Sequence, residues 1–239
     1  MRTAYRRWSA YPYSGEQKPP TPYPAAASYP MFFITRGVNN SFLDPLGQPI
    51  KWKIKNPSSV DWESELLRVE QTLSRLTSQQ TQIANYWANA ETTENMTPII
   101  FHLAKKYKLG SPLVARILAY FHGGINDAFV ISWYFKYLWD VARPNQYGRN
   151  INPVLPTPRF PAYPSAHATV AGCGEAVLSY IFPADATDIK IIMEQCALSR
   201  LYAGVHFKVD NDEGLRLGRQ IGGMVVEVMK RENSTMNRF

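Results

Sequence analysis

The stretch SRLYAGVHFKVD, residues 199–210, places a cation, an imidazole and a carboxylate at short, fixed intervals. Arg200 comes six residues before His206, and Asp210 comes four residues after it. Two earlier stretches, KYLWDVARP at residues 136–144 and PSAH at residues 164–167, add two cations, a hydroxyl and a second histidine. Together the three stretches predict a pocket that holds a tetrahedral oxyanion on three sides and leaves the fourth side for attack or ligation.

Lys136, Arg143 and Arg200 would have to converge for this pocket to exist. Two like charges about 5 Å apart repel by roughly 3 kcal/mol at an effective dielectric constant near 20. A fold therefore keeps such a cluster only where an anion offsets the repulsion. Arginine suits this task because its planar fork presents several N–H donors to oxyanion oxygens at once. Taken singly, each of these residues would instead be interpreted as a solvated charge on a helix.

The hydrophobic pattern from about residue 60 onward predicts a mainly α-helical bundle, because apolar residues recur at three- and four-residue intervals. Four helices are expected to begin at a Ser59 cap, at Ser78, at Pro98 and at Ser111, the third ending at Tyr107 and the fourth near Val141. Three more are expected over residues 165–182, 186–203 and 212–231. Prolines interrupt residues 145–164, which are therefore expected to form an irregular loop.

This layout predicts where the charged groups lie. Lys136 and Arg143 are seven residues apart, so they are expected to share one helix face, with Arg143 at the helix end. Ser165 and His167 begin the next helix, where free N–H groups and the positive end of the dipole favour an anion. Ser165 could serve only as a helix cap, or it could cap the helix and bind the anion as well. The proline-rich loop is expected to bring Phe160 over the pocket.

Residues 1–57 differ from the rest of the chain, because prolines and tyrosines crowd their first half. This composition predicts an extended arm ahead of an α-helical catalytic domain at residues 58–239. The aromatic residues suggest that the arm packs either on its own domain or on a partner subunit. The second alternative would give a homo-oligomer formed through the arm. Residues 51–55 alternate polar and apolar side chains, which predicts a short strand in a minor hairpin.

Composition excludes several other classes of protein. The formal net charge of +7 is not accompanied by a nucleic-acid-binding motif, so nucleic acid is not an expected partner. No run of 18 apolar residues lacks charges, and no apolar core follows the basic residues near the start, so neither membrane insertion nor a signal peptide is expected. The location is expected to be cytoplasmic or is left undetermined. Cys173 and Cys196 are expected to be buried thiols, with a disulfide between them left open.

The three stretches together resemble the superfamily of vanadium haloperoxidases and type-2 phosphatidic acid phosphatases, over roughly residues 127–225. FPAYPS at residues 160–165, Trp133 and residues 206–219 resemble the soluble bacterial chloroperoxidase-like branch. The resemblance implies a helical bundle of the haloperoxidase and acid phosphatase type. One position departs from the family, which usually has glycine where this chain has Ala166. The family uses the N–H of that residue on the oxyanion; alanine keeps this N–H, and its methyl group would narrow the pocket or restrict the backbone.

The resemblance also implies a role for each site residue. Lys136, Arg143, Ser165, Ala166 and Arg200 would bind the vanadate or phosphate oxyanion. His206 would ligate vanadium or, in a phosphatase, act as the nucleophile. Asp210 would accept the other ring N–H of His206, and His167 would be the acid–base residue on the opposite side. Trp133 and Phe160 would line the halide side of the pocket, although both could be simple core residues.

The function implied first is that of a vanadate-dependent haloperoxidase-type enzyme, which oxidises a halide with hydrogen peroxide and needs vanadate as cofactor. The alternative is a soluble acid phosphatase that hydrolyses phosphate esters through a phosphohistidine at His206 and needs no cofactor. A non-catalytic protein with a retained pocket is a third interpretation. His102 and His122 are interpreted as ordinary helix histidines. Asp127 is left outside the site because it is out of phase with Lys136 on their common helix.

Overall fold

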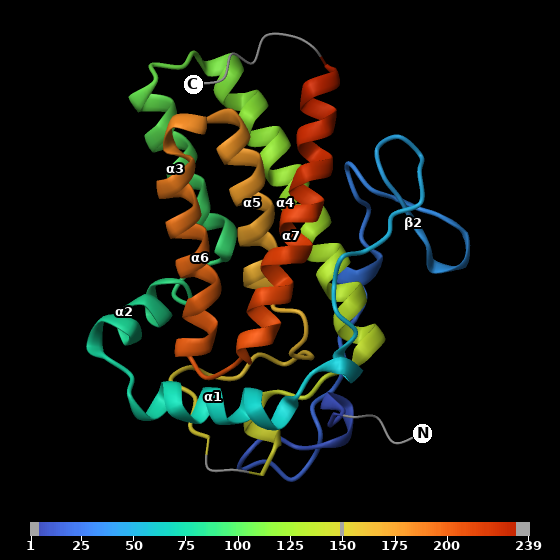
Figure 1. Ribbon diagram of the computed structural model, residues 1–239, viewed down its shortest axis with the longest axis vertical. Coiled ribbons are helices and arrows are strands. Elements are labelled where there is room, and N and C mark those ends of the chain that lie inside the picture. Colours follow the sequence, from blue (N-terminus) through green and yellow to red (C-terminus); the bar gives the residue numbers. More distant parts are fainter. Residues whose placement is uncertain (1–4, 149–150, 233–239) are drawn as a thin grey trace.

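A computed structural model describes residues 5–148 and 151–232 of the chain. Within these residues it contains seven α-helices: α1 (Trp62–Ser74), α2 (Ser78–Tyr86), α3 (Thr92–Lys106), α4 (Ser111–Trp139), α5 (Ala166–Ile181), α6 (Ala186–Tyr202) and α7 (Lys208–Arg231). Figure 1 shows α3 to α7 running along the long axis of the molecule, with α1 lying across one end. The predicted mainly helical bundle is confirmed.

Short elements connect and precede these helices. The 3₁₀ helices are η1 (Trp8–Ala10), η2 (Ala25–Ser28), η3 (Val38–Asn40), η4 (Pro57–Ser59), η5 (Pro144–Gln146) and η6 (Pro183–Asp185). Two strands, β1 (Thr35–Arg36) and β2 (Phe42–Leu43), pair antiparallel, with Thr35 opposite Leu43. The predicted irregular loop at residues 145–164 begins with part of η5 and contains no helix or strand over residues 151–164, while residues 149–150 lie outside the described part of the chain.

Close contact between α5 and α7 fixes the beginnings of both helices. A Cβ atom at Gly218 would lie 1.9 Å from the Thr169 carbonyl oxygen, and one at Gly172 would lie 2.4 Å from the Leu215 carbonyl oxygen. Only glycine lets the two backbones approach this closely. The contact continues to the N-termini, where the Ser165 N–H donates to the Asp210 carbonyl oxygen at 2.9 Å. The PSAH stretch therefore lies beside the stretch that contains His206.

The turn after α4 corrects the predicted placement of Arg143. The helix ends at Trp139 rather than near Val141, because Asp140 adopts a left-handed conformation (φ 53°). Arg143 lies beyond the helix in extended backbone (φ −76°, ψ 157°), consistent with the steric effect of Pro144 on the preceding residue. Lys136 and Arg143 therefore do not share a helix face.

Three helix starts also differ from the prediction. The cap of α1 is Asp61 rather than Ser59, and its carboxylate accepts the N–H of Ser64 at 3.2 Å. Helix α3 begins at Thr92 with Pro98 in its interior, since the buried face formed by Met96, Ile100 and Leu103 outweighs the loss of one backbone hydrogen bond. Helix α7 begins at Lys208 rather than Asp212, which places Asp210 in its first turn.

The predicted strand at residues 51–55 is wrong. These residues are extended, but their backbone bonds to side chains of α7: the Lys53 N–H donates to Gln220 Oε1 at 2.8 Å, and the Lys55 N–H donates to Glu213 Oε2 at 3.1 Å. Trp52 and Ile54 pack against the core between them. The alternating pattern therefore reports which side chains face inward, while the hairpin forms at β1 and β2 instead.

The arm packs on its own bundle along one side of α4 (Figure 1). Asp127, fully buried on α4, accepts the backbone N–H groups of Phe32, Phe33 and Ile34 at 2.8, 2.8 and 3.0 Å. Burial raises the pKa of this carboxyl group. Asp127 thus holds the arm and does not contact the predicted site. Residues 1–4 of the predicted arm lie outside the described part of the chain.

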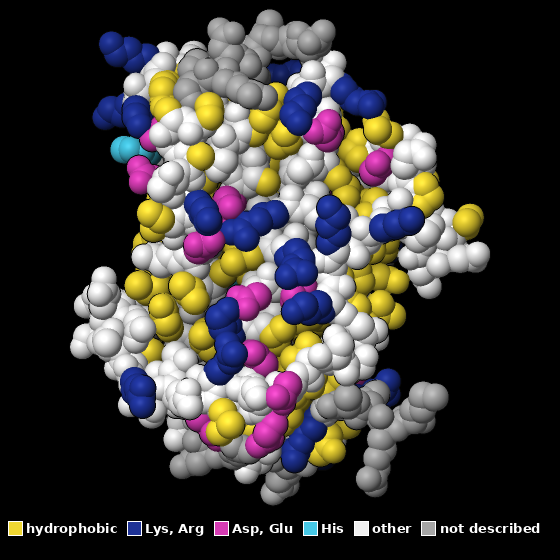
Figure 2. All heavy atoms as spheres, in the orientation of Figure 1, with side chains coloured by type: hydrophobic (Ala, Val, Ile, Leu, Met, Phe, Trp, Pro, Cys, Tyr) yellow, Lys and Arg dark blue, Asp and Glu magenta, His cyan; other side chains and the backbone are white. Residues whose placement is uncertain are grey.

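Charged side chains of both signs are mixed on the surface. Figure 2 shows Lys and Arg side chains interspersed with Asp and Glu, and Arg219, for example, pairs with both Glu175 and Glu194. The positive net charge therefore does not form a single basic patch on this face.

Cys173 and Cys196 are buried free thiols, as predicted. Over the described ranges, no helix has both the length and the apolar character needed to cross a bilayer.

Candidate active site

His206 and Asp210 form the centre of the candidate site at the start of α7. The Nδ1 atom of His206 lies 2.8 Å from Oδ2 of Asp210, and both side chains are buried. The same carboxylate oxygen accepts the N–H of Phe207 at 3.0 Å, so Asp210 also caps the helix. Because the carboxylate accepts, Nδ1 carries the ring proton and Nε2 keeps its lone pair.

Arg143 approaches His206 from the turn after α4. Its Nη1 lies 2.8 Å from His206 Nε2 and 2.8 Å from the carbonyl oxygen of Val205, while its Nε donates to the Phe160 carbonyl oxygen at 2.9 Å. Its Nη2 is buried and has no hydrogen-bond partner among the described residues. A buried guanidinium N–H group without an acceptor is costly, so this atom is suited to an anionic oxygen.

Lys136, on α4, is a second fully buried cation of the candidate site. Its Nζ donates to the carbonyl oxygens of Pro161 and Ala162, at 2.8 and 2.9 Å. An ammonium group has three N–H donors, so one remains for a ligand. Burial, reinforced by the charge of Arg143, lowers the pKa of Lys136 well below its usual value. A nearby anion would offset both effects.

Arg200 and His167 are oriented by the C-terminal end of α2. Arg200 Nη2 donates to the Ala84 carbonyl oxygen at 3.0 Å, and His167 Nε2 lies 3.3 Å from the Trp87 carbonyl oxygen. The carbonyl can only accept, so His167 carries its proton on Nε2 and has its lone pair on Nδ1. Burial, followed by the charge of Arg200, lowers the pKa of His167 to about 3. Sequence reasoning missed this part of the site, since backbone carbonyls leave no signature in a residue pattern.

Ser165 and Ala166 complete the set at the start of α5. Ser165 is fully buried and caps the helix, its Oγ accepting the Ala168 N–H at 3.4 Å. Ala166 is the first residue of the helix, so its N–H has no acceptor within the helix. The helix start therefore offers a hydroxyl and free N–H groups beside His206, through the Ser165–Asp210 backbone contact described above.

The electrostatics show that the predicted charges converge on one imidazole. The pKa of His206 lies well below its usual value, first because of burial and then because of Arg143, Lys136, His167 and Arg200. Burial also lowers the pKa of Arg143 to about 10, with a smaller contribution from Arg200 in the same direction. Burial raises the pKa of Asp210 to about 7. Three buried cations beside one buried carboxylate leave an excess of positive charge that an anion would neutralise.

Phe160 and Trp133 cover this cluster on one side. The Phe160 ring centre lies 5.1 Å from Lys136 Nζ and 4.9 Å from Arg143 Cζ, and 4.7 Å from the Trp133 ring centre. Both aromatic side chains are half-buried. Hydrogen bonds thus connect Arg143 with His206 and Phe160, whereas Asp127 lies elsewhere and His122 bonds to Thr97 on α3. The roles expected of the site residues from sequence stay predictions.

Comparisons with known proteins concern the fold. The family model described as the VCPO second helical-bundle domain matches residues 185–235. A comparison with curated proteins finds no match. Among solved structures, the first bacterial vanadium-dependent iodoperoxidase is similar, with 20% identity, a TM-score of 0.63, and coverage of 86% of this chain and 64% of that one.

Two further structures represent the two activities of the superfamily. The holo-type bacterial vanadium-dependent chloroperoxidase shows 16% identity and a TM-score of 0.67, covering 87% of this chain and 55% of that one. The transmembrane PAP2-type phosphatidylglycerolphosphate phosphatase from Bacillus subtilis shows 15% identity and a TM-score of 0.54, covering 75% of this chain and 91% of that one. This chain thus spans less than two thirds of either peroxidase. Its fold is that of the vanadium haloperoxidase and PAP2 superfamily, as predicted.

Proposed function

We propose that this chain is a vanadate-dependent haloperoxidase-type enzyme. The observation that carries the proposal is the arrangement around His206, whose Nδ1 is fixed by Asp210 and whose Nε2 lone pair faces a buried cation. Arg143 Nη2, buried without a partner among the described residues, marks a place for an anionic oxygen. One imidazole lone pair and a surrounding set of N–H and O–H donors are the groups that a vanadate ion needs.

His206 Nε2 would be the protein ligand to vanadium. The remaining oxygens would be held by Lys136, Arg143 and Arg200, together with the Ser165 hydroxyl and the N-terminus of α5. When bound, vanadate supplies an electrophilic centre that activates hydrogen peroxide at a constant metal oxidation state. The overall reaction is balanced: halide, hydrogen peroxide and one proton give hypohalous acid and water, and the halide loses the two electrons that cleave the peroxide bond.

His167 would move the proton in this reaction. Its Nε2–H is directed to the Trp87 carbonyl oxygen, which leaves Nδ1 as the proton acceptor. Burial and the charge of Arg200 lower its pKa to about 3, so the ring is neutral near pH 7 and its lone pair is free. A bound anion would offset the charge of Arg200 and make this nitrogen more basic. Phe160 and Trp133 exclude water beside two cations. A halide is weakly hydrated and can enter such a surface more readily than a strongly hydrated anion.

The second candidate is an acid phosphatase, which the same neutral His206 supports. Nε2 of His206 would attack phosphorus, the ester P–O bond would break, and the alcohol would leave with a proton from His167. Water would then cleave the P–N bond. This reaction requires His167 to be protonated when the alcohol leaves, and burial with the charge of Arg200 disfavours that form before an anion enters. We favour the peroxidase because the Phe160 ring, packed against Trp133, covers Lys136 and Arg143 with an apolar surface suited to a halide.

One assay separates the two functions. Purified protein, with and without vanadate, is tested for bromide-dependent halogenation of a phenolic dye and for hydrolysis of an aryl phosphate. We expect halogenation that requires vanadate and is removed by excess phosphate, because both anions compete for one pocket. Phosphate hydrolysis inhibited by vanadate, with no halogenation, would instead establish the phosphatase. Activity of either kind that responds to neither anion would overturn the single-pocket proposal.

A further inference from the structure

Tyr13 of the N-terminal arm contacts the loop that carries Phe160. Its side chain is buried, and its hydroxyl donates to the Pro158 carbonyl oxygen at 2.6 Å while accepting the Trp8 Nε1–H at 2.7 Å. The same Pro158 carbonyl accepts the backbone N–H of Phe160 at 3.0 Å. A single oxygen atom thus joins the arm to the turn that directs the Phe160 ring over Lys136 and Arg143.

A second contact connects the arm to the other side of Arg143. The Gln146 amide donates from Nε2 to the carbonyl oxygens of Trp8 and Tyr11, at 2.9 and 2.6 Å. Its Oε1 accepts the backbone N–H of Arg143 at 2.7 Å. Gln146 is therefore fixed by arm backbone on one side and fixes Arg143 on the other. The arm supports both the turn that carries Arg143 and the loop that covers it.

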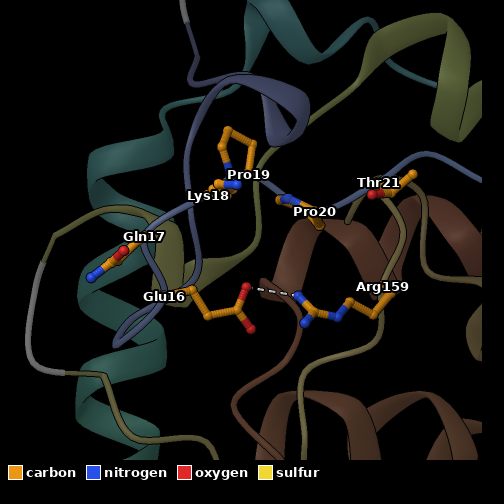
Figure 3. Close-up of a pocket in the computed structure, with 7 residues that line it drawn as sticks. All are labelled: Glu16, Gln17, Lys18, Pro19, Pro20, Thr21 and Arg159. Carbon is orange, nitrogen blue, oxygen red and sulfur yellow. Dashed lines mark hydrogen bonds and ion pairs between the residues drawn. The ribbon is translucent and has the colours of Figure 1, made fainter.

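The arm then continues across the loop toward α4. The Cζ atom of Arg159, the residue next to Phe160, lies 5.4 Å from the Tyr13 ring centre. Its Nη1 pairs with Glu16 Oε2 at 2.8 Å (Figure 3). Residues 16–21 and Arg159 line an open surface pocket of about 690 Å³. The Tyr23 N–H donates to the Tyr137 hydroxyl at 3.1 Å, one residue from Lys136. The Tyr23 and Glu16 contacts are exposed, whereas the hydrogen bonds that Trp8 makes with Tyr13 and with Gln146 are buried.

We propose that Tyr13 is a positioning residue of the oxyanion pocket, acting through Phe160. The loop at residues 151–164 has no helix or strand to hold it, so long-range hydrogen bonds must fix the Phe160 ring. With the ring in place, water is kept from Lys136 and Arg143, and both cations remain available to the anion. This inference rests on the proposed function in one respect, namely that the pocket binds vanadate or phosphate.

The test compares Tyr13→Phe with the matched control Tyr5→Phe. Tyr5 is also on the arm, and its hydroxyl donates to a carbonyl oxygen, that of Trp139, at 3.0 Å. Vanadate and phosphate dissociation constants are measured by calorimetry on the full chain. We expect Tyr13→Phe to weaken binding by about tenfold, equivalent to roughly 1.4 kcal/mol, and Tyr5→Phe to change it less than about twofold. Equal affinities in the two variants would overturn the inference.

A double-mutant cycle separates positioning from a general loss of stability. If Tyr13 acts through Phe160, adding Tyr13→Phe to Phe160→Ala should weaken anion binding by less than about twofold. The same tenfold loss in both backgrounds would contradict the inference. Phe160→Ala leaves intact the backbone carbonyl that accepts from Arg143, so the variant retains that contact.

Amide hydrogen exchange provides a readout that does not depend on anion binding. The amides of Phe160 and Ala162 should exchange faster in Tyr13→Phe than in wild type, and at the wild-type rate in Tyr5→Phe. Unchanged exchange in Tyr13→Phe would refute the positioning role whatever the anion affinity. If wild type binds neither vanadate nor phosphate but Tyr13→Phe still shows the faster exchange, only the proposed function is refuted.

Discussion

His206 Nε2 and Arg143 Nη1 lie 2.8 Å apart, and since a guanidinium cannot accept a hydrogen bond, Nε2 must be the acceptor. Asp210 fixes the same tautomer from the other side of the ring. The imidazole therefore presents a lone pair toward the place where Arg143 has a buried N–H group without a partner in the described part of the chain. An anion that enters this place would bond to Arg143 and take over the lone pair of His206.

The first prediction is that His206→Ala abolishes function but not folding. Loss of the ligand or nucleophile should weaken vanadate binding by more than the roughly 10–100-fold typical of removing a residue that only supports a ligand. Turnover in either assay should disappear. Calorimetry measures the binding, and circular dichroism checks that the helical content is unchanged. A folded variant with near-wild-type affinity would remove His206 from the site.

The second prediction is that Asp210→Asn weakens vanadate affinity by about 10–100-fold without abolishing binding, because the variant no longer enforces the Nδ1–H tautomer. The control is Asp212→Asn, which changes an exposed carboxylate two residues away that pairs with Lys208. This control should bind as wild type does. If the two variants behave alike, Asp210 is a helix cap only.

The spacing of His206 and Asp210 is the part of the site that sequence predicts best. The two residues lie within one short stretch, so their relation depends on local backbone geometry alone. The helices are predicted for the same reason, since their apolar periodicity is local. The position of Arg143 is not predicted by the sequence, because it depends on the left-handed conformation of Asp140. The contacts from Ala84, Trp87 and Tyr13 join residues 80 to 145 positions apart in the sequence, and nothing in the local pattern specifies them.

The third prediction concerns the arm. Asp127→Asn replaces one oxygen of the carboxylate that accepts three backbone N–H groups with an NH₂ group, which cannot accept a hydrogen bond. The change should therefore destabilise the protein by about 2–4 kcal/mol. Residues 28–36 should become sensitive to limited proteolysis, while the bundle remains helical. Asn126→Ala removes the contacts of Asn126 Nδ2 to the Pro30 carbonyl oxygen and to Asp127 Oδ1, at 2.9 and 3.1 Å, but leaves the carboxylate that accepts the three backbone N–H groups, so it should have a smaller effect. Equal resistance to protease in wild type and Asp127→Asn would show that other contacts hold the arm.

The fourth prediction is a pH dependence of stability due to His167. Its pKa in the folded protein is about 3, below the usual 6.5, so the unfolded chain takes up a proton first as pH falls. His167 therefore contributes stability above about pH 6.5 that is lost as the pH falls toward 3. His167→Gln should remove this contribution, so the difference in unfolding free energy between wild type and variant should shrink between pH 7 and pH 4. Denaturant titrations without added anion measure it, and a constant difference would contradict the burial of the neutral ring.

The last prediction separates the two candidate functions through the aromatic residues. Phe160 and Trp133 cannot ligate an oxyanion, but Phe160 covers two cations and Trp133 packs against it at 4.7 Å. In a peroxidase, Trp133→Ala should raise the bromide concentration needed for half-maximal turnover by several-fold while vanadate affinity changes less, because the halide loses its dehydrated surface. In a phosphatase, the same change should alter the range of aryl phosphates hydrolysed, and bromide should have no effect at any peroxide concentration.

Phe129→Ala, on the same helix and 6.1 Å from Trp133 between ring centres, is the control for general loosening of this region and should leave the bromide dependence unchanged. Vanadate-loaded wild type without halide-dependent turnover between about pH 5 and 8, the range in which an ordinary histidine titrates, would refute the peroxidase, and hydrolysis of an aryl phosphate by the same protein would then decide for the phosphatase.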